Sequence, residues 1–168
     1  MAQKGFTLVE LMITVTILGI LLALAAPSFS DVLARQRIAG AASDLSSDLM
    51  LARIEASRRG GRVSLCPSAD GVACGAVGDW SRGWIVFSDP DGDGVIAAAT
   101  DIVRTRRIES PQIRIAVTGA PLSTTFQMTG RLNVARQWTV CVSGRLGRVL
   151  DARLTGVVTA YPTAAACV

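Results

Sequence analysis

The architecture of this chain is set near its start, where residues 5–26 read GFTLVELMITVTILGILLALAA. The run from Phe6 to Ala26 holds 21 residues with a single charged member, Glu10, and no proline before Pro27. As an α-helix, a run of this length reaches about 30 Å, the thickness of the hydrocarbon layer of a membrane. The sequence therefore predicts a membrane-spanning helix at residues 6–26.

Two other interpretations compete for the same residues. A secretory signal peptide also begins with a cation and an apolar run, and Ala23-Leu24-Ala25 is similar to its cleavage site. A buried core helix is the second alternative, but a chain of 168 residues is short for enclosing a helix so apolar. Glu10 favours the membrane helix over the signal peptide, because signal peptides avoid acids in their apolar run.

Glu10 is a candidate for subunit assembly. An acid inside an apolar span costs about 3 kcal/mol on insertion scales, so it marks a site with a specified partner. Cleavage of the chain between Gly5 and Phe6 would create a new α-amino group near the membrane surface. Glu10 of a neighbouring copy would pair with this amine, and the pair would set the register between subunits.

The residues from Gly5 to Leu11 resemble the type IV prepilin signature, which pilins share with the pseudopilins of type II secretion. The resemblance implies that a prepilin peptidase removes residues 1–5 as a leader by cutting between Gly5 and Phe6, and that Phe6 is then N-methylated. It also implies that the apolar helix stays as a membrane anchor and later becomes the packing spine of a filament.

The rest of the chain predicts an α+β fold, type IV pilin-like, with a long spine helix packed against antiparallel β-sheets. Residues 27–60 continue the helix as an amphipathic second half, because apolar residues recur there every three or four positions until paired glycines end the pattern. Residues 61–168 form a globular β-rich domain of short β-branched runs. Seven strands are expected, at 63–66, 84–88, 102–108, 113–117, 124–128, 138–142 and 148–154. Trp84 and Trp138 are expected in the core, whereas Trp80 stays unassigned.

Two internal segments resemble the GspH/FimT family of minor pilins and pseudopilins. They are Arg53-Ile54-Glu55-Ala56 near the expected helix end and Trp84-Ile85-Val86-Phe87 before an aspartate-rich stretch. This resemblance implies a low-copy subunit at or near a filament tip.

Four cysteines, Cys66, Cys74, Cys141 and Cys167, allow three pairings in an oxidising compartment. We favour Cys66 with Cys74, which closes a short loop, and Cys141 with Cys167, which ties the end of the chain to a strand. A zinc site is the alternative, but the spacing is not Cys-x2-Cys and the chain has no histidine.

Residues 89–94 match the first half of a calcium loop, with carboxylates at Asp89, Asp91 and Asp93 and a glycine in sixth place. Thr100 stands at the twelfth position, where a bidentate Glu belongs. A plain hairpin turn is the favoured interpretation, and a weak calcium site is the alternative.

The last third of the chain is basic, with nine Arg against Glu109 and Asp151 in residues 102–168. A GC-rich genome, whose codons favour Arg, is one explanation, and an anionic partner is the other. The candidate residues for binding double-stranded DNA are Arg104, Arg106, Arg107, Arg145 and Arg148. FimT-type DNA receptors of natural transformation carry a Gly-Arg-x-Arg motif, and residues 144–148 are similar to it but one residue longer. An ordinary glycine turn with solvated arginines is the alternative.

The absence of histidine excludes histidine-dependent catalysis and imidazole metal sites, so neither enzymatic activity nor a cofactor is expected. The resemblance implies a minor type IV pilin that initiates assembly or caps the pilus tip. Two alternatives are a DNA-binding tip pilin for natural transformation and an H-type pseudopilin of type II secretion. The implied partners are other pilins, prepilin peptidase and the inner-membrane assembly platform. The implied location is the inner membrane, with one span and a periplasmic domain, and afterwards the pilus tip.

Overall fold

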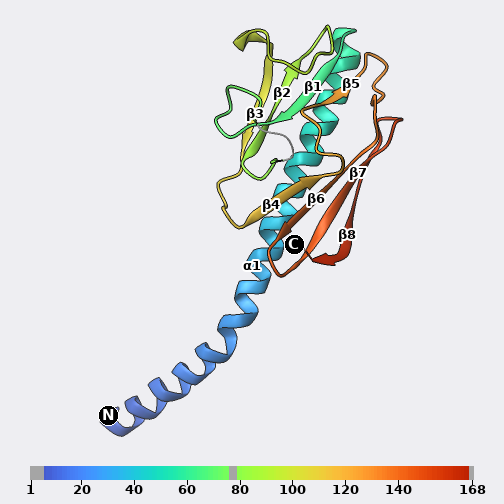
Figure 1. Cartoon of the computed structure of the whole chain (residues 1–168). Coiled ribbons are helices and arrows are strands. Elements are labelled where there is room, and N and C mark those ends of the chain that lie inside the picture. The colour runs from blue at the N-terminus through green and yellow to red at the C-terminus, as the bar shows by residue number, and fades with distance from the viewer. Residues whose placement is uncertain (1–5, 76–78, 167–168) are drawn as a thin grey trace. The chain divides into compact units, whose positions relative to one another are not determined.

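The structure, a computed structural model, describes residues 6–75 and 79–166, without the side chains of residues 23–28, 146 and 164–166 (Figure 1). The chain divides into two compact units, Met1–Gln36 and Arg37–Val168. Helix α1, Leu8–Arg59, supplies residues to both units.

The first unit is helical and exposes the large apolar side chains that the structure describes in it. Large apolar residues between Leu8 and Leu22 are more than half exposed, Leu8 at 73% and Ile17 at 53%. The predicted membrane span at 6–26 extends into residues 23–26, whose side chains lie outside those described. In the part of the chain that the structure describes, no helix has the length and mean hydropathy that crossing a membrane requires.

The part of α1 in the second unit is amphipathic, as the sequence predicts. Its buried residues recur at intervals of three or four, which places them on one face of the helix: Ile38, Ala41, Ala42, Leu45, Leu49, Ala52 and Ala56. The helix ends where paired glycines predict it. Gly60 adopts φ 63°, a left-handed conformation that costs glycine little, and Gly61 N–H donates to the Ala56 carbonyl at 3.2 Å.

Two antiparallel four-stranded sheets complete the second unit (Figure 1). The first sheet has the order β3-β2-β1-β5, from β3 Ile102–Arg107, β2 Gly83–Ser88, β1 Val63–Pro67 and β5 Thr124–Phe126. The second has the order β4-β6-β7-β8, from β4 Ile113–Val117, β6 Arg136–Val142, β7 Leu146–Ala152 and β8 Val158–Ala166. A single 3-10 turn, η1 Ala99–Asp101, precedes β3.

All seven strands expected from the sequence are present, and β8 was not expected. This strand holds Pro162 and several alanines, which are depleted in strands, so its pattern is weak. β8 forms an edge of its sheet, where a proline is tolerated because the outer N–H groups need no ladder partner.

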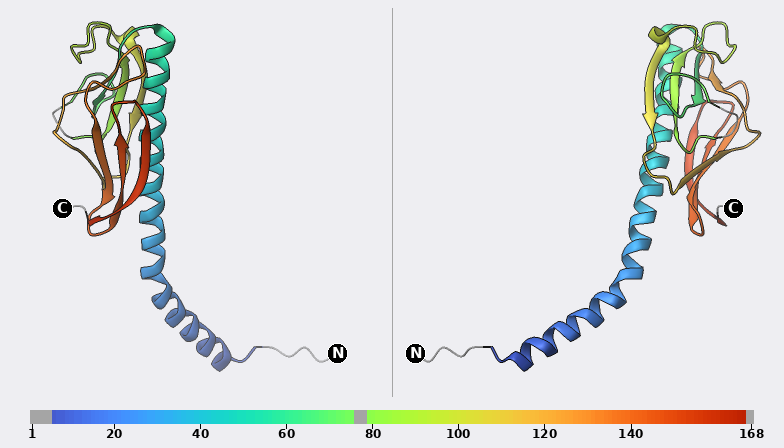
Figure 2. Two further views of the ribbon diagram at one scale, coloured as in Figure 1. Left: turned by 90° about the vertical axis from the view of Figure 1, so that its right-hand side faces the viewer. Right: turned by 60° about the vertical axis from the view of Figure 1, so that its left-hand side comes forward.

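The core lies between the buried face of α1 and the two sheets, which cover the same side of the helix (Figure 2). Trp80, Trp84 and Trp138 are all fully buried, so the expectation for Trp84 and Trp138 is confirmed. Trp80 joins them, packing edge-to-face on Trp138 with ring centroids 5.7 Å apart. A polar loop between strands thus contributes an aromatic residue to the core.

Candidate functional site

The N-terminal signature forms a capped helix start. Phe6 is 80% exposed, and Gly5 lies outside the described residues. Thr7 N–H and Thr7 Oγ1 both donate to Glu10 Oε2, at 3.0 and 2.9 Å, while Glu10 N–H donates to Thr7 Oγ1 at 3.3 Å. These reciprocal bonds are a capping box, in which residue N3 returns to the N-cap.

This capping role of Glu10 was not predicted, although the Thr-x-x-Glu spacing before an apolar helix is its signal. Within one chain, the Glu10 carboxylate accepts both of its bonds from Thr7. Its pairing with the α-amine of a neighbouring subunit stays a prediction.

The cysteines that the structure describes are oxidised. Cys66 and Cys74 form a disulfide with their Cα atoms 5.5 Å apart, as predicted, so these thiols are unavailable to zinc. Cys141 is disulfide-bonded, and its predicted partner Cys167 lies outside the described residues.

The loop that the Cys66–Cys74 disulfide closes is organised by Asp70. Its carboxylate accepts the backbone N–H groups of Val72 and Ala73 at 2.8 and 3.1 Å and the hydroxyl of Ser68 at 3.1 Å. These bonds, the one from Val72 foremost, lower the pKa of Asp70 below its ordinary value. The Asp70 carboxylate therefore stabilises its own loop through Oδ1.

The candidate calcium residues Asp89, Asp91 and Asp93 come together, with carboxylate oxygens within 4.8 Å of one another. Asp89 is buried and accepts the hydroxyl of Ser64 and the backbone N–H groups of Gly92 at 2.9 Å and Gly94 at 3.2 Å. Such bonds are those of a side chain that stabilises a turn, so they support the favoured hairpin-turn interpretation. Calcium binding stays a prediction.

Two of the candidate DNA-binding arginines contact the buried Asp48 of α1. Arg104 Nη1 donates to Asp48 Oδ1 at 3.3 Å, and Arg106 Nε donates to Asp48 Oδ2 at 3.2 Å. Trp84 Nε1 donates to the same carboxylate at 3.0 Å. The bond to Asp48 is the main cause that raises the pKa of Arg106. These arginines therefore bind strand β3 to the helix.

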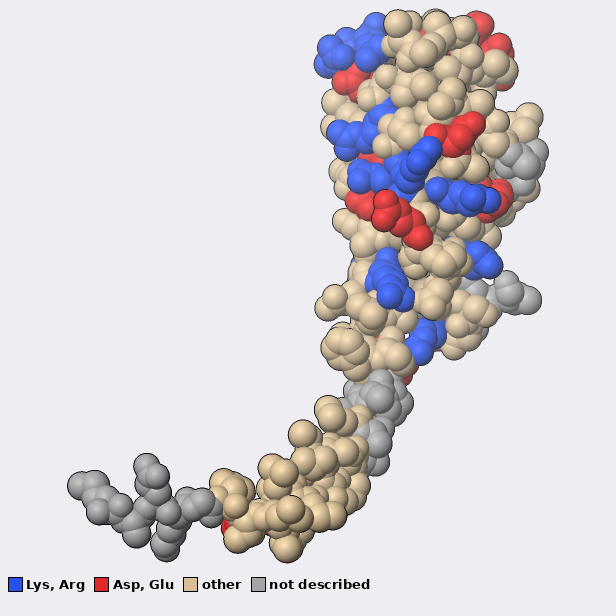
Figure 3. All heavy atoms as spheres, turned by 90° about the vertical axis from the view of Figure 1, so that its left-hand side faces the viewer, with Lys and Arg blue, Asp and Glu red and all other residues tan. Residues whose placement is uncertain are grey.

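The other candidate arginines lie elsewhere. Arg107 Nη2 donates to the Asp70 carbonyl at 2.5 Å. Arg145 and Arg148 belong to the β6–β7 hairpin of the second sheet, whereas β3 is an edge of the first, so the structure does not bring the two groups onto one sheet. Figure 3 shows acidic and basic side chains interspersed on one face of the domain, without a uniformly basic surface there.

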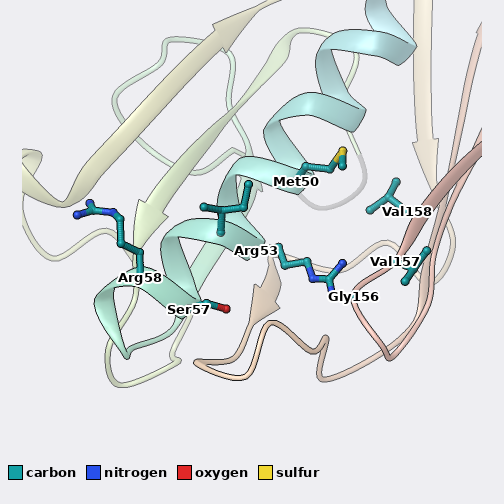
Figure 4. Close-up of a pocket in the computed structure, with 8 residues that line it drawn as sticks. Met50, Arg53, Ser57, Arg58, Gly156, Val157 and Val158 are labelled. Atoms are coloured by element: carbon teal, nitrogen blue, oxygen red, sulfur yellow. The ribbon is translucent and has the colours of Figure 1, made fainter.

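A groove that the sequence did not indicate lies between the last turns of α1 and the start of β8 (Figure 4). Its volume is about 660 Å³. Met50, Ile54, Val157 and Val158 give it an apolar lining, and Arg53 and Arg58 add two cations. The sequence did not indicate it because one of its walls is the turn at Gly156–Val157 that leads into the unexpected strand β8.

Comparison with known proteins gives consistent matches. Residues 41–156 match the family model described as type II transport protein GspH, and residues 1–26 match the prokaryotic N-terminal methylation motif. A fimbrial protein of Dichelobacter nodosus is 41% identical over 91 residues, 54% of each chain, and one of Moraxella nonliquefaciens is 37% identical over 99 residues, 56% of this chain and 62% of the relative. This chain thus spans about half the length of the curated relatives that it matches.

The fold also occurs in a solved structure. The type IV minor pilin FimU of Pseudomonas aeruginosa superposes with a TM-score of 0.60 at 22% identity, covering 79% of this chain and 94% of FimU. The match confirms the predicted fold, a long helix packed against antiparallel β-sheets. The GspH family model covers more than half of the chain and the methylation motif precedes it, so the chain belongs to the GspH family within the type IV pilin-like superfamily.

Proposed function

We propose that this protein is a minor type IV pilin that enters a pilus through α1 and acts at the tip or in the initiation of assembly. The observation that carries the proposal is the exposure of apolar side chains from Leu8 to Leu22. A surface so apolar needs lipid or the helices of other subunits around it. The methylation motif and the fold shared with a minor pilin support this role.

The proposal includes processing and location. Prepilin peptidase cuts between Gly5 and Phe6, and Phe6 is methylated. The apolar helix anchors the chain in the inner membrane until the assembly platform and other pilins receive it. A periplasmic domain is consistent with the Cys66–Cys74 disulfide, because the periplasm allows such bonds to form and persist.

A second candidate is the H-type pseudopilin of a type II secretion filament, which the description of the GspH family model favours. Both candidates use the same helix and the same processing, and both leave the protein without chemistry of its own. DNA capture gains no comparable support, because Arg104 and Arg106 are engaged with Asp48.

The test is mass spectrometry on chains from the native cell, together with their quantification in sheared filaments. We expect a mature chain that begins with N-methylated Phe6 and is present in filaments at a small fraction of the major subunit. Processing after Ala25 contradicts the proposal, as does absence from pili. Presence only in secretion filaments decides for the pseudopilin.

A further inference from the structure

We propose that the groove beside α1 binds the β2–β3 loop, residues 89–98, of a second copy of this chain. The inference deepens the proposed assembly role, because it names a contact between subunits. It rests on the chemistry of two surfaces in the second unit, the groove and the loop.

The groove combines exposed apolar groups with an unpaired cation. Met50 is 52% exposed and Ile54 61%, and both line it together with Val157 and Val158. Figure 4 shows Met50 directed toward Val158 and the Arg53 side chain directed toward Gly156. Among the described residues, the half-buried Arg53 guanidinium has neither a hydrogen bond nor an ion pair. A fitting occupant therefore offers a carboxylate next to aliphatic side chains.

The β2–β3 loop offers this combination. Asp91 is exposed, and within the described part of the chain its carboxylate accepts no hydrogen bond and forms no ion pair. Val95, four residues later, is 60% exposed. Two contacts hold the loop on the first sheet. Asp89 accepts hydrogen bonds from the backbone N–H groups of Gly92 and Gly94. Ile96 packs on the buried cluster of Ile85 and Phe87. Asp91 and Val95 are thus presented by an anchored loop, which lowers the entropy cost of binding.

Other acidic segments fit less well. Asp70 lies near the exposed Val72, but its carboxylate is taken by its own loop. Glu10 has aliphatic neighbours, but Thr7 donates two bonds to it. Glu109 lies in a polar hollow together with Arg82 and Arg114. Among the described segments, the loop that contains Asp91 has both an unpaired carboxylate and an exposed aliphatic side chain, and it lies outside the hollow that holds Glu109.

The loop follows β2 in the first sheet, and the groove lies beside β8 of the second sheet (Figure 1). Two different surfaces meet in the contact, so it is heterologous. A heterologous contact of this kind can join two copies side by side while one groove and one loop of the pair stay open to other subunits.

The test is disulfide cross-linking between two differently tagged full-length copies in detergent micelles with EDTA. One copy carries Ile54→Cys and the other Val95→Cys, since the described native cysteines are already oxidised. A matched control replaces Val95→Cys by Val72→Cys, whose valine is 68% exposed. A further arm uses Val9→Cys, which reports the apolar helix of the second copy as the occupant.

We expect the 54–95 cross-link to exceed the 54–72 control by about fivefold, and Arg53→Glu or Asp91→Arg to lower its yield by about the same factor. Combining Arg53→Glu in one copy with Asp91→Arg in the other is expected to restore the yield. Circular dichroism of each variant checks that the fold is retained.

Equal yields for positions 95 and 72 overturn the inference, and so does a yield that ignores both charge reversals. A dominant 54–9 cross-link assigns the groove to the apolar helix instead. These readouts need no pilus, so a failed contact and a failed pilin role are distinguishable.

Discussion

Asp48 is a fully buried carboxylate that Trp84, Arg104 and Arg106 share. The arginine side chains are 48% and 30% exposed, so they reach water if the carboxylate is lost, whereas the Trp84 N–H does not. We expect Asp48→Ala to lower the free energy of unfolding by about 2 kcal/mol, mainly because a buried donor loses its acceptor. Denaturant unfolding measures this change. Asp44→Ala is the control, since its exposed pair with Arg106 is worth less than about 1 kcal/mol.

Glu55 gives the domain an acid-sensitive contact. Hydrogen bonds from Arg58 and then Arg59 lower the pKa of its carboxyl from 4.5 to about 2. A carboxyl whose pKa is lower in the folded state stabilises the fold above its unfolded pKa, and this contribution is lost as the pH falls from 4.5 toward about 2. We therefore expect the melting temperatures of the wild type and Glu55→Gln to differ above pH 5 and to converge near pH 2.

Glu109→Gln is the matched control for the same chemical change, because Glu109 is exposed and has no ion pair among the described residues. At neutral pH it should change the melting temperature less than Glu55→Gln does. A constant difference between Glu55→Gln and the wild type would contradict the assigned contact.

Helix α1 depends at its start on the Thr7–Glu10 capping box. We expect Thr7→Ala to destabilise the first turn by about 1 kcal/mol, because an N-cap hydroxyl satisfies a backbone donor that has no partner within the helix. Amide hydrogen exchange of residues 8–11 in micelles should become faster. Thr14→Ala, which removes a hydroxyl bonded to Leu11 O inside the helix, should leave exchange in the first turn unchanged.

The Cys66–Cys74 disulfide fixes the connection between β1 and the loop that leads to β2. Replacing both cysteines by serine should lower the free energy of unfolding by about 2–3 kcal/mol, mostly through the unfolded chain. Urea unfolding of the double variant measures the loss. The comparison is then repeated under reducing conditions, in which the wild type also lacks this disulfide. If the difference in stability between the double variant and the wild type disappears, the disulfide is its cause. If the difference persists, the serine substitutions are its cause.

The molecule as a whole keeps its core in one of its two units. Every member of the main core cluster, from Ile38 to Ala152, lies in Arg37–Val168. We expect a chain that starts at Arg37 to remain folded without detergent, with the near-ultraviolet circular dichroism and melting temperature of the full-length domain. A transition that is broadened or lost in this truncated chain would show that residues 1–36 contribute to the core.

The amino-acid sequence by itself predicted the features that depend on local pattern. The apolar run, the amphipathic helix with its end at Gly60, seven strands and the Cys66–Cys74 pair follow from periodicity, turn residues and spacing, all of which act over a few positions. Contacts between distant segments settled the rest. Whether Arg104 meets a phosphate or Asp48, whether Trp80 is buried, and where an alanine-rich edge strand closes a groove depend on which surfaces fold against each other. Burial and pairing between residues far apart in the chain are properties of the packed domain, which no window of sequence contains.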